Sequence, residues 1–256
     1  MLLVIDIGNT TIAVSLFKGK ELLSKYSLEH FPQITDVALS ESFVSVFGNV
    51  NIEGCIISSV VETLTDVVFV AVNNTYKVNS IILDSDMDIG VNLNVKNPEA
   101  IGSDRLANMC AASVLYNKYP LVVVDCGTAT TFDVLDKNGD FTGGLIMPGF
   151  SMQLQSLHEH TSKLPVVELK NYNKAHKVMC TTTKNQILSG VIRGHVCSIE
   201  GLLEYCAAEL GEKPFVVITG GGADIIQEYM AKDKYDVIDP MLTLEGARLA
   251  YERNMD

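Results

Sequence analysis

The chain has 256 residues, of which 47% are hydrophobic, 20% charged and 7% aromatic. This ordinary globular composition excludes disorder, collagen-like repeats and a small disulfide scaffold. Lysine and arginine total 19 and aspartate and glutamate total 31, so the formal net charge is −12. Broad binding along a phosphate backbone needs clustered cations, so we expect no nucleic-acid partner. A bound nucleotide remains possible, because local backbone donors and Mg²⁺ can outweigh the global charge.

The sequence favours a cytoplasmic protein that does not enter a membrane. The first residues carry no basic segment, and Asp6 interrupts the opening apolar run, so no signal peptide is expected. No stretch approaches the ~20 apolar residues of a membrane helix. The six cysteines form no Cys-x-x-Cys pair, which favours reduced core thiols over a zinc or redox site. The cluster at residues 158–160 could touch a metal, but a solvated surface is the favoured interpretation.

In chain order, short apolar runs and turn signals predict a first α/β half. We expect strands at residues 2–5, 12–17, from the turn at 18–20 to 26, 54–60 and 80–83, and helices at 40–47 and 62–74. Ser103 stands where a helix N-cap is expected, ahead of a helix over residues 104–117.

The second half begins with the same pattern. We expect strands at residues 121–124, 132–135, 141–147 and 215–219, and helices at 151–161, 183–210 and 243–254. An Asn-Gly pair at residues 137–140 is a strong hairpin signal.

The two halves share a strand, an Asp-x-Gly-(Asn/Thr)-x-Thr turn and a second strand. The turns begin at Asp6 and Asp125, 119 positions apart. This period is longer than that of a solenoid, so we expect two copies of one domain, at residues 1–117 and 118–256.

These turns have two interpretations. Glycine lets a backbone approach a ligand closely, successive N–H groups form a concave anion site, and an Asp beside a polyphosphate can position Mg²⁺. A hairpin turn whose polar side chains bond their own backbone is the alternative. Two copies at strand ends favour the phosphate site, which together would clamp a nucleotide.

Two further segments are candidates. The run Gly220–Gly222 follows a strand and can admit a flat ring or ribose, although a tight turn explains it equally well, and no P-loop or Rossmann fingerprint is present. The run Gly102-Ser103-Asp104-Arg105 holds one of only four arginines. Its Asp104 could accept a substrate hydroxyl proton and its Arg105 could bind an anion, while helix capping is the alternative.

With these motifs the sequence resembles the type III pantothenate kinases of the acetate and sugar kinase, heat-shock and actin superfamily. The match covers nearly the whole chain. It runs through Asp6–Thr11, Asn97-Pro98, Gly102–Arg105, Asp125–Thr131, Gly143–Gly149, Leu164-Pro165, Thr183, Ser189-Gly190, Thr219–Gly222 and Leu242–Gly246.

The resemblance implies an α/β fold of two ribonuclease-H-like domains, with mixed sheets flanked by helices and ATP bound between them. It implies ATP-dependent phosphorylation of pantothenate to 4'-phosphopantothenate, the first step of coenzyme A biosynthesis, by a homodimer. Asp104 would be the general base, Asp6 would lie near Mg²⁺, and Asp125 would bind a monovalent cation, K⁺ or NH₄⁺.

The resemblance also implies two sets of binding residues. Those expected to bind ATP, with the glycine turn added, are Asp6, Ile7, Gly8, Asn9, Thr10, Thr11, Ile12, Ala13, Thr128, Gly220, Gly221 and Gly222. Those expected at the substrate are Gly102, Ser103, Asp104, Arg105, Thr183 and Val95.

The chain departs from the family pattern at two positions. Val95 stands where the family commonly has a tyrosine that contacts the substrate, and Ser103 stands where alanine is common. One lost hydroxyl partner, at roughly 0.5–1.5 kcal/mol, weakens substrate binding by about tenfold or less. Another small-molecule kinase of the superfamily and a non-catalytic nucleotide-binding regulator remain as alternatives, although the retained aspartates argue against the regulator.

Overall fold

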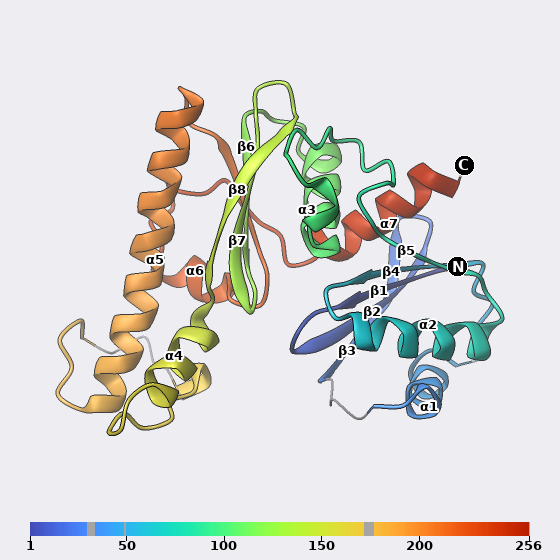
Figure 1. Ribbon diagram of the computed structural model, residues 1–256, viewed down its shortest axis with the longest axis horizontal. Coiled ribbons are helices and arrows are strands. Elements are labelled where there is room, and N and C mark those ends of the chain that lie inside the picture. The colour runs from blue at the N-terminus through green and yellow to red at the C-terminus, as the bar shows by residue number, and fades with distance from the viewer. Residues whose placement is uncertain (30–33, 49, 172–176, 256) are drawn as a thin grey trace. The chain divides into compact units, whose positions relative to one another are not determined.

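The computed structural model describes residues 1–29, 34–48, 50–171 and 177–255. By residue contacts the chain divides into two compact units. Unit 1 comprises Met1–Asn117 and Met241–Asp256, and unit 2 comprises Lys118–Pro240. Each unit contains one five-stranded sheet with helices packed on it (Figure 1). The expected α/β class, with mixed sheets flanked by helices, is confirmed.

Unit 1 is built on the strand order β3-β2-β1-β4-β5, in which the first three strands are antiparallel and β4 and β5 run parallel to β1. Its strands are β1 (Leu2–Ile7), β2 (Thr11–Lys18), β3 (Glu21–Glu29), β4 (Gly54–Ser59) and β5 (Ser80–Ile82). Its helices are α1 (Asp36–Phe47), α2 (Glu62–Tyr76), the short 3-10 helix Pro98–Ala100, α3 (Ser103–Leu115) and α7 (Leu242–Met255).

The alternation of side chains along β1 sorts the helices of unit 1 between the two faces of the sheet. Leu3, Ile5 and Ile7 share one buried cluster with apolar side chains of α1 and α2. Residues at the intervening positions, Asp6 among them, point to the opposite face. There α7 contacts β1 and β4, and α3 contacts β4. The polar end of β1 therefore faces the helix layer that contains α3.

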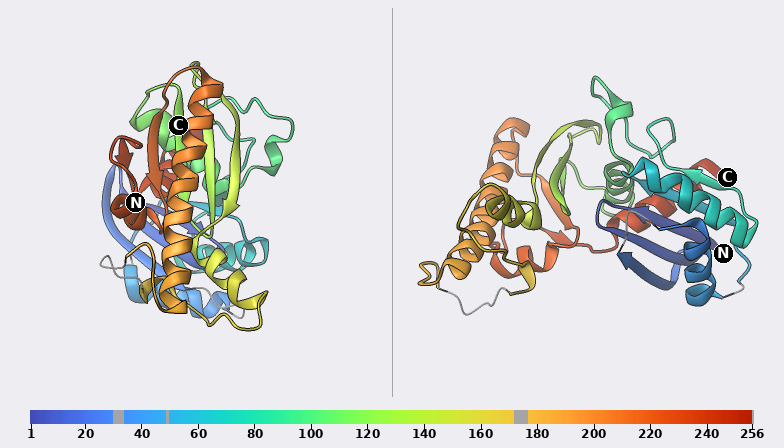
Figure 2. Two further views of the ribbon diagram at one scale, coloured as in Figure 1. Left: turned by 90° about the vertical axis from the view of Figure 1, so that its left-hand side faces the viewer. Right: turned by 60° about the horizontal axis from the view of Figure 1, so that its bottom comes forward.

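Unit 2 has the strand order β10-β9-β6-β7-β8. Its strands are β6 (Leu121–Cys126), β7 (Ala129–Leu135), β8 (Phe141–Pro148), β9 (Phe215–Thr219) and β10 (Val237–Ile238). Its helices are α4 (Phe150–Glu159), the 3-10 helix Leu169–Asn171, α5 (Thr183–Leu210) and α6 (Ala223–Tyr229). The long helix α5 lies along one face of this sheet (Figure 2, left) and shares a buried core with it.

The internal repeat predicted from the sequence is present in the topology. β6 to β10 take the same places in their sheet as β1 to β5 in theirs. Asp6 and Asp125 are each the fifth of six residues in the central strand. The two motifs therefore occupy equivalent positions in two copies of one frame.

The predicted domain of residues 118–256 differs from unit 2 at its end, because α7 packs on unit 1. Two features of α7 explain this. Gly246 has no side chain, and a Cβ there would overlap the backbone carbonyl of Ala107 in α3. Thr243 also donates a hydrogen bond to Oδ1 of the buried Asn108, at 2.8 Å. The close approach of α3 and α7 fixes the last helix to unit 1.

Two smaller differences concern helix lengths and membranes. The helix expected at residues 40–47 begins at Asp36, because the hydroxyl of Thr35 accepts the backbone N–H of Ala38 and caps it. Within the described ranges, no helix has the length and apolar character needed to cross a bilayer.

Candidate active site

The first phosphate motif forms the turn that joins β1 to β2 in unit 1. Asp6 pairs with Ala13 of β2 and lies beside Ser58 of the parallel strand β4. The turn is closed by the N–H of Gly8, which donates to the carbonyl of Thr11 at 2.9 Å. Asn9, Thr10 and Thr11 are exposed at its tip, whereas Ile7 and Ile12 are buried beneath it.

The hydroxyl of Ser58 donates a 2.7 Å hydrogen bond to Oδ1 of Asp6. Ser58 is fully buried, and it lies 3.3 Å, oxygen to oxygen, from the hydroxyl of Ser103. Sequence reasoning missed Ser58. The signal was a serine near the end of a buried strand, but its role depends on the parallel register that places it beside Asp6.

Ser103 does not cap α3, so this expectation was wrong. Gly102 is the N-cap residue, and Ser103 is the first residue of the helix, without a side-chain capping bond. The Ser103 hydroxyl instead accepts the N–H of Ser59 at 2.6 Å and donates to the Ser59 carbonyl at 2.8 Å. The register of β4 brings that peptide within reach, so the hydroxyl ties the start of α3 to the end of β4.

Asp104 lies in the first turn of α3, immediately after this tie. Its Oδ1 accepts the backbone N–H of Arg105 at 2.7 Å. Burial raises the pKa of the Asp104 carboxyl above its ordinary value, and the Arg105 N–H and charge partly oppose that shift. A desolvated carboxylate of raised pKa is a better proton acceptor than an exposed one. The site can therefore supply a general base.

The other predicted substrate residues of unit 1 lie near Asp104 in the chain. Gly102 accepts the N–H of Arg105 through its carbonyl at 3.0 Å, and the Arg105 side chain is half-buried. Val95 is half-buried in the irregular segment before Pro98–Ala100.

The second phosphate motif forms the equivalent turn in unit 2. Asp125 pairs with Thr131 of β7 and with Thr219 of β9. Thr128 is exposed in the turn, and its carbonyl accepts the N–H of Gly149 at 3.0 Å. The turn is therefore held from β8 as well as from its own strands.

The glycine turn Gly220–Gly222 packs against the same motif. Gly220 has a φ of +88°, and a Cβ there would overlap Oδ1 of Asp125, so only glycine fits both the backbone and the contact. Gly222 donates its N–H to the carbonyl of Cys126 at 2.8 Å. The structure thus brings Asp125, Thr128 and the glycine turn together at one end of the sheet.

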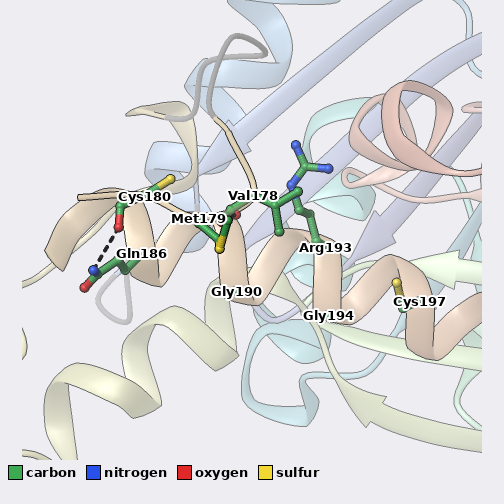
Figure 3. Close-up of a pocket in the computed structure, with 9 residues that line it drawn as sticks. Val178, Met179, Cys180, Gln186, Gly190, Arg193, Gly194 and Cys197 are labelled. Carbon is green, nitrogen blue, oxygen red and sulfur yellow. Dashed lines mark hydrogen bonds between the residues drawn. The ribbon is translucent and has the colours of Figure 1, made fainter. Parts of the chain in front are cut away.

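Thr183 is exposed in the first turn of α5, after the N-cap Thr182. A pocket of about 470 Å³ lies further along this helix (Figure 3). Its lining residues are Val178, Met179, Cys180, Gln186, Ser189, Gly190, Arg193, Gly194 and Cys197. None of the predicted site residues is among them, so this pocket is separate from the phosphate turn.

Sequence reasoning also passed over His195, in the middle of α5. Its side chain is only 1% exposed and contacts polar groups of β7 and α4. The signal was a histidine among apolar positions of a long helix, which does not by itself name its partners. The cluster at residues 158–160 lies at the end of α4, where Nδ1 of His158 is 2.8 Å from the carbonyl oxygen of Leu164. No metal-binding group of three His, Cys, Asp or Glu was found among the residues that the structure describes.

The chain matches known proteins over nearly its full length. The family model of type III pantothenate kinase matches residues 2–205. A type III pantothenate kinase of Dehalococcoides mccartyi (strain CBDB1) is 34% identical over 258 residues, covering 99% of this chain and 96% of the relative.

Solved structures support the fold alone, because their sequence identities are low. A putative 2-dehydro-3-deoxygalactonokinase from Sinorhizobium meliloti has a TM-score of 0.61 at 10% identity, covering 98% of this chain and 96% of that one. The component A of Acidaminococcus fermentans (R)-2-hydroxyglutaryl-CoA dehydratase has a TM-score of 0.56 at 15% identity, covering 97% and 95%. With the repeated topology they confirm two ribonuclease-H-like units. The family match and the full-length relative together show that the chain belongs to the type III pantothenate kinase family.

Proposed function

We propose that Asp104 is the general base of this kinase, which phosphorylates pantothenate with ATP in coenzyme A biosynthesis. The observation that carries this assignment is the desolvated carboxylate of Asp104, whose pKa is raised and whose Oδ1 is held by the Arg105 N–H. Asp104 takes the proton of the primary hydroxyl while the hydroxyl oxygen bonds to the γ-phosphorus. The bond from that phosphorus to the bridging oxygen breaks, and ADP leaves.

The phosphate motifs of both units are proposed to bind ATP. In unit 1 the residues are those from Asp6 to Ala13, and in unit 2 they are Thr128 and Gly220–Gly222. Their support is the turn geometry: the tip residues at Asn9 and Thr10 and the Thr128 side chain are exposed, while each turn is held by its strands. Backbone N–H groups in such turns favour anions, and a fixed turn positions phosphates without reorganisation.

Asp6 is proposed to hold Mg²⁺. A carboxylate oxygen is the ligand that Mg²⁺ prefers, and Mg²⁺ usually takes one or two carboxylates together with substrate phosphates and waters. Asp6 at the end of β1, with Oδ1 fixed by Ser58, fits this mode. When bound, Mg²⁺ neutralises phosphate charge, and the residues of this chain orient the phosphates and the hydroxyl.

Asp125 is proposed to bind a monovalent cation, K⁺ or NH₄⁺. Its carboxylate lies in a cradle that a side chain at position 220 would fill, and Gly127 also approaches Oδ1. A carboxylate surrounded by backbone suits a cation of low charge. The substrate residues proposed in addition to Asp104 are Gly102, Ser103, Arg105, Val95 and Thr183.

We also propose a cytoplasmic homodimer. The edge strand β8 exposes Leu145 and Ile146, at 36% and 66%, and Met179 is 88% exposed. An unpaired apolar edge of this kind is stabilised by a partner surface. The six cysteines are free thiols, as a reducing compartment keeps them. Size-exclusion chromatography with light scattering tests the dimer, and a monomer at micromolar concentration contradicts it.

The general base is tested by ADP release from ATP and pantothenate. Asp104→Asn removes the proton acceptor and keeps the shape, so we expect kcat to fall by about a hundredfold or more. Glu99→Gln is the matched control, because Glu99 is an exposed acid in the preceding 3-10 helix, and its kcat should stay near that of the parent. Near-normal turnover of Asp104→Asn at saturating substrate contradicts the assignment. Titration of Mg²⁺, K⁺ and NH₄⁺ in the same assay tests the cations.

A further inference from the structure

His195 joins two elements that support the second phosphate turn. Its Nε2 is 2.9 Å from Oγ1 of Thr130 in β7, and its Nδ1 is 2.7 Å from Nε2 of Gln153 in α4. The Phe150 ring packs on the imidazole, with 4.3 Å between the ring centroids. These contacts form inside unit 2, where both His195 and Thr130 are buried.

The partners of Gln153 determine which imidazole nitrogen carries the proton. Nε2 of Gln153 also lies 2.8 Å from the carbonyl oxygen of Pro148. A carbonyl only accepts, so the amide nitrogen donates one hydrogen to Pro148 and has its second for Nδ1 of His195. Nδ1 is therefore the acceptor, and the neutral ring carries its hydrogen on Nε2, which donates to Thr130. The Thr130 hydroxyl in turn hydrogen-bonds the thiol of Cys126.

These bonds enclose the turn at Gly127 and Thr128. Thr130 pairs with Cys126 across the base of the turn. On the other side, Pro148 precedes Gly149, whose N–H donates to the Thr128 carbonyl. His195 thus contacts β7 directly, and reaches the end of β8 through Gln153.

We propose that His195 is a positioning residue that holds the phosphate turn in its ATP-binding geometry. As a neutral Nε2–H tautomer it fixes Thr130 on one side and Gln153 on the other. This role rests on the proposed contact between Thr128 and the ATP phosphates. His195 itself touches no substrate, so its loss should weaken ATP binding while leaving the pantothenate site unchanged.

The experiment measures kcat and the KM values for ATP and pantothenate in four variants. His195→Leu and Thr130→Val each break the bond between α5 and β7, and should raise the KM for ATP by about three- to tenfold, with the KM for pantothenate unchanged. Thr130→Ser keeps the hydroxyl and should restore the parent KM. Val196→Ala, a buried neighbour in α5, is the packing control and should lower the melting temperature without changing either KM.

Two results separate this proposal from the proposed function. Thr128→Ala should raise the KM for ATP. If it does so while His195→Leu and Thr130→Val lower only the melting temperature, the positioning role is refuted and the phosphate site stands. If Thr128→Ala also leaves the KM for ATP unchanged, both fail. Long-range ¹⁵N–¹H NMR of the parent at pH 7 should show the neutral Nε2–H tautomer of His195, and an Nδ1–H or cationic ring contradicts the geometry. Should His195→Leu fail to fold, Thr130→Val and the NMR spectrum still decide.

Discussion

Replacement of Gly246 by alanine tests why the last helix packs on unit 1. Gly246 lies inside α7, where it faces the backbone of Ala107 in α3. A Cβ at this position would lie 3.0 Å from the Ala107 Cα and overlap its carbonyl carbon and oxygen. Backbone atoms in the middle of a packed helix cannot rotate away as a flexible side chain can. The two helices must therefore separate.

The expected cost follows from two opposing effects. Alanine gains about 1 kcal/mol over glycine in a helix interior. Overpacking costs typically about 1–3 kcal/mol, and the backbone overlap puts this position at the upper end. The net loss of unfolding free energy is about 2 kcal/mol, which lowers the melting temperature by about 4–8 °C for a chain of this size.

Gly201→Ala is the matched control. Gly201 lies inside α5, and a Cβ there would meet nothing within 4 Å. This variant should be more stable than the parent by about 1 kcal/mol, so the two glycine-to-alanine changes should act in opposite directions. The assay is urea unfolding followed by circular dichroism, with thermal melts beside it. A Gly246→Ala protein as stable as Gly201→Ala would refute the packing of α7 against α3.

Three further predictions follow from buried titratable groups. Burial raises the pKa of Asp104, so the charged carboxylate costs stability at neutral pH, and Asp104→Asn should raise the melting temperature while it abolishes ADP release. Burial lowers the pKa of His195 from 6.5 to about 4. The unfolded chain therefore binds this proton first, and stability should fall by about 2 kcal/mol between pH 6.5 and 4, a loss that denaturant titrations should find reduced in His195→Leu. Cys197 is exposed, so mass spectrometry after brief alkylation should find it modified first. Burial raises to about 12 the pKa of three thiols that should react only in denaturant, Cys55, Cys110 and Cys126.

The repeated frame could be predicted because its signals are local. Each half opens with a strand, an Asp-x-Gly turn and a second strand, and the structure gives both halves the same strand order. The place of α7 could not be predicted in this way. An amphipathic helix at the end of a chain can cover either sheet, and the choice here depends on a close contact between Gly246 and Ala107, which are far apart in the sequence.

The candidate site shows the same division between local and distant information. The aspartates and glycines of the turns stand out in the sequence because turns need them. Ser58 and His195 do not stand out, because their partners come from other elements. Ser58 meets Asp6 only through the parallel register of β1 and β4, and His195 meets Thr130 only after α5 has packed on its sheet.

The equivalence of Asp6 and Asp125 explains how one frame can serve two roles. Both aspartates have a hydroxyl residue beside them on the parallel neighbour strand, Ser58 on β4 and Thr219 on β9. The chain then diverges. After β4 the peptide of Ser59 is tied to the start of α3, so polar side chains gather around Asp6. After β9 the turn at Gly220 brings bare backbone against Asp125. A carboxylate fixed among hydroxyl groups suits Mg²⁺ and phosphate, whereas one surrounded by backbone suits a weakly charged cation, so the proposed division of roles follows from what succeeds each parallel strand.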